Sequence, residues 1–131
     1  MKVIFNEVTS CLLTTFIFLL GGIDIALISF LLMMTFDYLT GVISGLYNKK
    51  LSSKIGFKGI LKKFAMIIVV AMCVIIDKLL GETGLIRTFI LYYFVANEGI
   101  SIIENLAEMN IKLPEKILNA LEQLKERGDN K

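Results

Sequence analysis

The sequence has no histidine, a single proline (Pro114) and only two cysteines among its 131 residues. Because Cys11 and Cys73 lie far apart inside apolar segments, neither a zinc site nor a disulfide framework is indicated. We expect both cysteines to pack as small apolar residues. The chain also shows no nucleophile–base pair, no set of metal ligands and no phosphate-binding loop. We therefore predict that it is not an enzyme and that it needs no cofactor.

Polar residues are scarce as well. The chain is 56% hydrophobic and its mean hydropathy is +0.74, whereas a soluble domain of this length keeps more of its residues polar for contact with water. The net charge is only +2, with lysines grouped in the middle of the chain and charges of both signs near its end. We predict one domain that is solvated by lipid.

Three segments, residues 23–47, 64–80 and 85–106, are apolar enough to be transmembrane helices. The first would be about 36 Å long as a helix, which exceeds the roughly 30 Å hydrocarbon thickness of a bilayer. We predict an all-α integral membrane protein. Its membrane domain covers residues 1–112, and residues 113–131 form a short amphipathic helix in the cytosol, opened by Pro114.

The N-terminal segment, residues 1–22, is harder to interpret. Residues 3–20 would reach about 27 Å as a helix, but Asn6, Ser10 and Thr14 recur every four residues and would form a polar stripe. A weak spanning helix, an amphipathic helix in the interface and a signal peptide are the three interpretations. A signal peptide fits poorly, since one lysine precedes the segment and no cleavage site follows. Between the other two, the sequence only slightly favours the shallow helix.

An acid and two glycines share one face of the segment 23–47. An ionised carboxylate deep in lipid is costly, so Asp37 is expected to face a partner helix or water; alternatively it lies near the interface and is hydrated or neutral. Gly41 and Gly45 form a small-xxx-small pattern that favours close helix packing, although such glycines also occur without an interface. We expect a helix-packing or oligomerisation face made of Asp37, Gly41, Ser44 and Gly45.

The stretch 48–63, predicted to be a loop, holds six lysines and no carboxylate. Because positively charged loops stay on the cytoplasmic side, this loop and the C-terminus should be cytoplasmic. The same charges suit anionic lipid headgroups. A nucleic-acid partner is not expected, since aromatic residues are nearly absent from the loop. The lysines are Lys49, Lys50, Lys54, Lys58, Lys62 and Lys63.

The segment 85–106 becomes polar in its second half. Five of its polar residues recur every three or four positions and predict one polar stripe that packs against another polar face, lines water, or lies partly outside the membrane on the cytoplasmic side. At the opposite ends of the spans, Asp77 and Lys78 are expected to pair with each other or with Arg87. The stripe consists of Asn97, Ser101, Glu104, Asn105 and Glu108.

Four motifs carry a family resemblance: FDYLTG at 36–41, SSKIGFKGILKKFAMI at 52–67, VIIDKLL at 74–80 and NEGISIIENLAEMNIKLPEKI at 97–117. In their order and spacing they resemble the toxin-secretion/phage-lysis holin family, which includes small phage holins and clostridial toxin-release proteins. The resemblance covers roughly residues 30 to 120. It implies a homo-oligomer in the bacterial cytoplasmic membrane that opens lesions. An endolysin or a toxin would then leave the cytosol without a required specific contact.

Two other classes of function stay open on the residues alone. In a small channel or transporter subunit, Asp37, Glu98 and Glu104 would be ion sites. In a membrane anchor, the lysine loop and the tail would bind a cytosolic partner. The size of the permeating species separates a holin from a channel, because a selective channel passes ions while a holin lesion passes folded protein.

Overall fold

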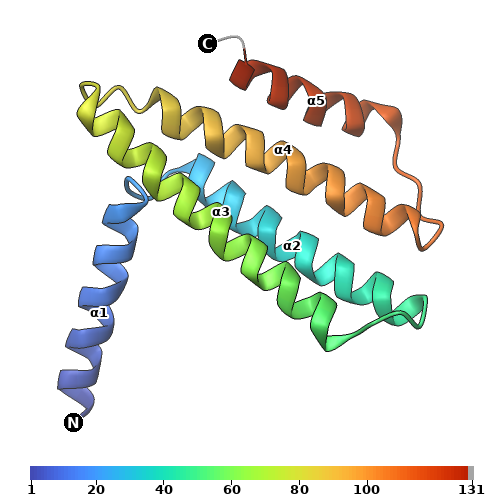
Figure 1. Ribbon diagram of the computed structural model, residues 1–131, viewed down its shortest axis with the longest axis horizontal. Coiled ribbons are helices and arrows are strands. Elements are labelled where there is room, and N and C mark those ends of the chain that lie inside the picture. Colours follow the sequence, from blue (N-terminus) through green and yellow to red (C-terminus); the bar gives the residue numbers. More distant parts are fainter. Residues whose placement is uncertain (130–131) are drawn as a thin grey trace.

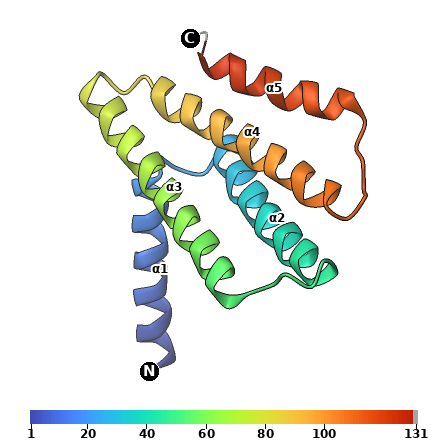
Figure 2. The ribbon, with the colours of Figure 1, turned by 45° about the vertical axis from the view of Figure 1, so that its right-hand side comes forward.

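The computed structural model describes residues 1–129, and these form five α-helices and no strand. Three of the helices pack as an antiparallel bundle, with α4 in contact with α2, α3 and α5 (Figure 1). The last helix folds back along α4, and the first diverges from the bundle (Figure 2). The helices are α1 (Lys2–Leu19), α2 (Ile25–Tyr47), α3 (Ser53–Leu79), α4 (Leu85–Ala107) and α5 (Glu115–Asp129). The predicted all-α fold is confirmed.

The connections between the helices define two ends of the bundle. At the end formed by residues 20–24 and 80–84, the chain turns sharply. Gly21 adopts a φ of +81° there, which a residue with a side chain rarely takes. A Cβ there would also lie 2.6 Å from the Arg87 Nε, so this glycine allows the Arg87 side chain to lie against the turn. The glycine end comprises residues 20–24 and 80–84, and the lysine end comprises residues 48–52 and 108–114.

Side-chain caps mark where the bundle helices begin. The Asp24 carboxylate accepts a hydrogen bond from the Leu27 N–H at 2.9 Å, and the Ser52 hydroxyl accepts one from the Ile55 N–H at 3.2 Å. Such caps satisfy N–H groups that have no partner within the helix. The Asp24 cap stands next to a long apolar run, so α2 starts where the local sequence predicts it, whereas the Ser52 cap starts α3 before its apolar run begins.

The apolar core lies in the half of the bundle nearer the glycine end. Phe30, Val70 and Leu91 are fully buried there, one from each bundle helix. The Phe30 and Phe94 rings stack with centroids 5.5 Å apart, which adds to the burial of both rings. The half nearer the lysine end has polar side chains between the helices instead, so the two halves are held together by different chemistry.

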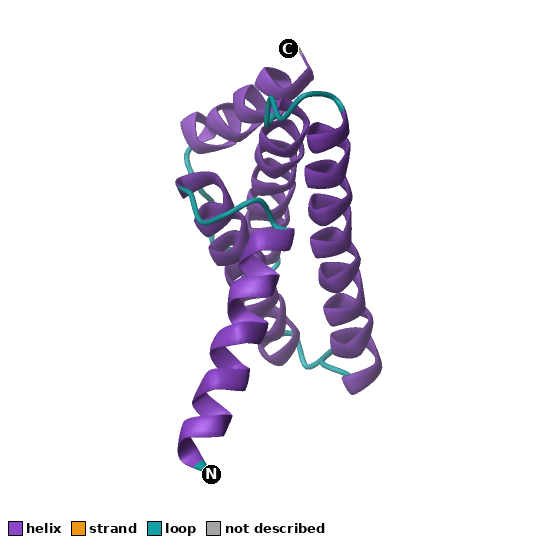
Figure 3. Ribbon diagram, turned by 90° about the vertical axis from the view of Figure 1, so that its left-hand side faces the viewer, coloured by secondary structure: helices purple, strands orange, loops and turns teal. Residues whose placement is uncertain are grey.

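The outside of the molecule is apolar. Helix α1 has no buried residue, and Figure 3 shows it protruding from the bundle. Four helices, α1 to α4, are long and apolar enough to cross a membrane by length and composition. In water such an exterior would be strongly unfavourable, whereas lipid solvates it. The molecule therefore has the surface of a membrane protein, and α1 qualifies as a fourth candidate span.

The structure corrects the prediction of a loop over residues 48–63. Helix α3 begins at Ser53, so the loop is only residues 48–52, and four of the six lysines are helical. Gly56 and Gly59, which lie in this stretch, are inside α3 and face the Tyr38 side chain of α2. The lysines interrupt the apolar run but not the helix, because lysine is a good helix former.

Candidate functional site: the charged cluster of the bundle

Three charged side chains, one from each bundle helix, meet inside the protein. The Lys63 Nζ of α3 lies 2.6 Å from the Asp37 Oδ2 of α2 and 2.5 Å from the Glu98 Oε2 of α4. Their side chains are 15%, 14% and 4% exposed, respectively. We call these three residues the charged cluster. It connects all three bundle helices by ion pairs alone.

The charged cluster has two carboxylates for one ammonium group. Charges at membrane depth are expensive unless they are paired, and breaking such a pair leaves an uncompensated charge. Among the described residues, every buried side-chain nitrogen or oxygen has a hydrogen-bond partner. The cluster therefore gives its buried polar atoms partners within the chain, while one carboxylate stays in excess over the single ammonium group.

Polar contacts continue from the charged cluster toward the lysine end, between α2 and α4. The Asn105 amide donates to the Asp37 carbonyl and carboxylate, each at 3.2 Å, and to the Thr40 hydroxyl at 3.0 Å. The Ser44 hydroxyl donates to the Glu108 carboxylate at 2.6 Å. Side-chain hydrogen bonds between membrane helices stabilise their association. These contacts hold α2 to α4 where the apolar core ends.

The predicted packing face of α2 is turned toward other parts of the same chain. Asp37 and Ser44 bond to α3 or α4, and a Cβ at Gly41 would lie 3.5 Å from the Asn105 amide nitrogen. Gly45 lies against Leu51, just after the helix. The face thus packs helices within one chain. Its role in oligomerisation stays a prediction.

The predicted polar stripe of α4 divides into two parts. Asn105 and Glu108 bond to α2, and Ser101 is half-buried on the same side. Glu104 is exposed, and Asn97 is half-buried and does not belong to the charged cluster. The predicted stripe leaves out Glu98, the most buried member of the charged cluster, which the sequence names only as an ion site of the alternative channel. The spacing of Glu98 with Ser101 and Asn105, three and then four residues, was the signal that could have found it.

Of the six lysines, five lie on the surface and one does not. Lys49 and Lys50 are exposed in the loop, and Lys54, Lys58 and Lys62 are exposed on α3. The Lys63 ammonium group is engaged in the charged cluster instead. Five lysines thus remain available for lipid headgroups at the lysine end, and that role stays a prediction.

A second group of charges closes the glycine end. The Arg87 guanidinium donates to the Leu20 carbonyl at 2.6 Å, to the Gly22 carbonyl at 3.0 Å and to the Asp24 carboxylate at 2.6 Å. This hydrogen bond from Arg87 holds the pKa of Asp24, which lies just before α2, below its usual value. We call this contact the arginine clamp. It fixes the α1–α2 connection onto the start of α4.

Asp77 supports the arginine clamp by binding backbone N–H groups at the start of α4. Its carboxylate accepts hydrogen bonds from the Ile86 N–H at 3.1 Å and the Arg87 N–H at 2.8 Å, which caps the start of α4. Lys78 does not pair with it, since its ammonium group lies 4.0 Å from the centre of the Phe18 ring of α1. Among the described residues, the expected charge pairing of Asp77 with Lys78 or with the Arg87 guanidinium is therefore not formed, and Asp77 reaches Arg87 only through its backbone N–H. Within residues 1–129, no cluster of histidine, cysteine or carboxylate side chains is arranged to hold a metal ion.

Comparison with known proteins matches residues 14–126 to the bacteriophage holin family. The chain belongs to the bacteriophage holin family. It is 33% identical to a probable holin of Bacillus phage phi105 over 95 residues, which cover 72% of this chain and 70% of that protein. Membership of this family supports a role as a holin, a location in a membrane and a function other than catalysis.

Bacterial relatives resemble this chain more closely over a longer stretch. An uncharacterized 14.9 kDa protein in the nagH 3' region of Clostridium perfringens is 46% identical over 112 residues, or 85% of each chain. The uncharacterized protein YqxH of Bacillus subtilis is 34% identical over 117 residues, covering 87% of this chain and 83% of its own length. No solved structure matches this chain.

Proposed function

We propose that this holin accumulates in the bacterial cytoplasmic membrane, associates with copies of itself and opens lesions. A peptidoglycan hydrolase or a toxin then leaves the cytosol through the lesion. The observation that carries the proposal is the family match over residues 14–126, combined with a charged cluster enclosed in an apolar bundle. Lipid solvates the dispersed protein through its apolar exterior, while the charged cluster lies between its helices.

The orientation follows from where the exposed cations lie. The lysine end has Lys49, Lys50, Lys54, Lys58 and Lys62 exposed. At the glycine end, Arg87 and Lys78 are accompanied by acids, and Arg87 is paired with Asp24. Since an excess of lysine and arginine marks the cytoplasmic side, the lysine end faces the cytosol and the glycine end faces outward. The proposal thus places the α4–α5 connection in the cytosol.

Controlled expression in bacteria tests the lesion. The chain is produced with and without an endolysin that lacks a secretion signal, while culture turbidity and release of a folded cytosolic reporter are followed. We expect lysis only when both proteins are present, and reporter release with the holin alone. Loss of membrane potential without reporter release would instead support a selective channel. Inserted protein without any leakage would support a membrane anchor.

Cysteine labelling tests the orientation. In a background with Cys11→Ser and Cys73→Ala, Lys50→Cys places a thiol in the loop of the lysine end, and Glu82→Cys places the matched control in the turn of the glycine end. A membrane-impermeant maleimide added to intact cells should label the Glu82→Cys protein and leave the Lys50→Cys protein unlabelled. The reverse pattern would invert the proposed orientation.

A further inference from the structure

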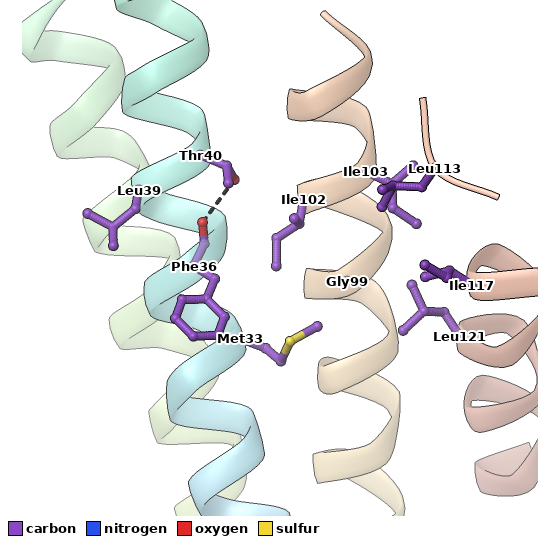
Figure 4. Close-up of a pocket in the computed structure, with 10 residues that line it drawn as sticks. All are labelled: Met33, Phe36, Leu39, Thr40, Gly99, Ile102, Ile103, Leu113, Ile117 and Leu121. Carbon is purple, nitrogen blue, oxygen red and sulfur yellow. Dashed lines mark hydrogen bonds between the residues drawn. The ribbon is translucent and has the colours of Figure 1, made fainter. Parts of the chain in front are cut away.

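Helix α5 is seated on a small-residue position of α4. Figure 4 shows Leu121 and Ile117 of α5 pointing toward Gly99, with Met33 of α2 on the opposite side. A Cβ at Gly99 would lie 2.7 Å from the Leu121 Cδ2, closer than real Cβ contacts, and 3.0 Å from the Met33 Cε, so the ends of both side chains would have to shift. We call this position the Gly99 face. At this position the ends of apolar side chains from α5 and α2 come close to the α4 backbone, because residue 99 has no side chain.

The docked α5 reaches far along α4. The Lys125 Nζ lies 5.4 Å from the centre of the Tyr93 ring. Tyr93 is 14 residues before the end of α4 at Ala107, which is about 21 Å at 1.5 Å per residue. In a bilayer with a hydrocarbon layer of roughly 30 Å, Lys125 would therefore lie deep in the membrane whenever α4 spans it.

The outward side of α5 is charged. Glu122, Glu126 and Arg127 are exposed in the docked position, whereas the surrounding exterior of the bundle is apolar. Charged side chains near the bilayer centre are costly and occur where they face protein or water. A spanning α4 and a docked α5 thus exclude each other when lipid is the neighbour.

We propose that α5 is a displaceable cover of the Gly99 face, which is released to the membrane surface when α4 spans the bilayer and is replaced by a spanning helix of a second copy. The connection of residues 108–114 acts as the pivot. The released helix suits the interface, since Ile117, Leu121 and Leu124 share one side of it.

A spanning helix of a second copy suits the Gly99 face better than α5 does. The face is lined by apolar groups such as Met33, Phe36 and Ile102, so it accepts a helix with an apolar inner side. At this depth the outer side of that helix must be apolar too, which α5 does not provide and the spanning helices of this chain do. This inference rests on the self-association in the proposed function.

Fluorescence depth measurements test the release of α5. Full-length chains with Cys11→Ser, Cys73→Ala and one new cysteine, either Glu126→Cys or the control Glu115→Cys, are labelled and inserted into phosphatidylethanolamine–phosphatidylglycerol vesicles. Lipids with a quencher at the bilayer centre should leave both labels equally bright, because a released α5 lies on the surface. Strong quenching at position 126 alone would show that α5 stays docked and would overturn the proposal.

A matched pair of glycine variants tests the replacement by a second copy. Gly99→Ala and Gly59→Ala each add one methyl group inside a helix, but only the first fills a close contact, since the nearest atom to a Cβ at Gly59 is 4.0 Å away. Energy transfer between labelled copies in vesicles should show about tenfold weaker association for Gly99→Ala and no change for Gly59→Ala. Equal behaviour of the two variants would contradict the proposed interface.

A third variant separates the cover from the interface. Leu121→Ala removes the side chain seated on Gly99 and leaves the Gly99 face open, so self-association should be unchanged or stronger. Weaker association than in the parent chain would show that α5 supports the assembly, and would overturn its role as a cover. If the parent chain associates and releases the reporter while α5 stays docked, this inference fails and the proposed function stands. If the parent chain never associates, the proposed function fails.

Discussion

The two ends of the bundle neutralise their charges in different ways. At the glycine end, Arg87 donates to two backbone carbonyls and to Asp24, while Asp77 accepts from two backbone N–H groups. In the half of the bundle nearer the lysine end, the charged cluster pairs Lys63 with Asp37 and Glu98 through side chains only. The arginine clamp therefore holds turns and helix starts in place, whereas the charged cluster only holds helices to each other.

This difference has a physical consequence. Backbone carbonyls are not neutralised by protonation, so the part of the arginine clamp that Arg87 makes with Leu20 and Gly22 does not depend on the ionisation of a partner. Side-chain ion pairs can exchange partners when helices move, and the cluster has a carboxylate in excess. We expect the glycine end to stay intact and the lysine end to rearrange when copies assemble.

The largest loss of stability is expected for Arg87→Met. It leaves the carbonyls of Leu20 and Gly22 and the Asp24 carboxylate without their donor, and breaking a buried ion pair costs about 3–5 kcal/mol. Because the Asp24 side chain is 47% exposed, we expect the lower end of that range. Unfolding by sodium dodecyl sulfate in mixed micelles, followed by circular dichroism, measures it. Lys78→Met is the control and should change little.

Lys63→Met should have a comparable effect, also about 3 kcal/mol, because it leaves two carboxylates close together without a cation. The same unfolding assay applies. A second substitution should restore part of the lost stability, so the double variant Lys63→Met with Glu98→Gln should unfold at a higher free energy than Lys63→Met alone. Arg87→Met combined with Asp24→Asn should recover little, since the carbonyls stay without a donor. Equal recovery at both ends would contradict the contrast drawn between them.

Asp77→Ala should cost about 1–2 kcal/mol, the usual value for removing a helix cap. The carboxylate is buried and accepts from the N–H groups of Ile86 and Arg87. Asp77→Asn, which keeps one acceptor oxygen, should lie between the parent chain and Asp77→Ala. Amide hydrogen exchange of residues 85–88 locates the effect, and unchanged exchange there would argue against a capping role.

The smallest effect is the pH dependence of the arginine clamp. Because Arg87 lowers the folded-state pKa of Asp24, this contribution to stability is fully present above the ordinary pKa of 3.8. It is lost as the pH falls from that value through the lower folded-state pKa. Comparing the unfolding midpoint of the parent chain with that of Asp24→Asn isolates it. Parallel pH profiles would show that Asp24 contributes nothing.

Hydrophobic patterning predicted the spans well where charge did not interrupt them. Residues 23–47 and 85–106 correspond closely to α2 and α4, because apolar runs and adjacent caps act locally. The start of α3 was placed eleven residues too late, at 64 instead of Ser53. Lysines were interpreted as marking a loop, although their side chains extend from a continuous helix.

The candidate site was predicted only in part. The spacing of Asp37, Ser44 and Asn105 indicated polar faces on α2 and α4, and the structure turns these faces toward each other. Glu98 was left out of the stripe and Lys63 was assigned to the lipid surface. Periodicity shows which residues share a helical face, but not which face a neighbouring helix covers, since that depends on packing between distant segments.

Residue order alone establishes a membrane protein of long helices, with their approximate limits and the lysine excess at one end. Those properties depend on hydrophobicity, caps and charge within single segments. Which charges neutralise each other is decided by packing, since Lys63 reaches an acid 26 residues before it and another 35 residues after it. Packing also decides that α5 contacts α4 at Gly99. Only the relative placement of folded helices brings such partners within bonding distance.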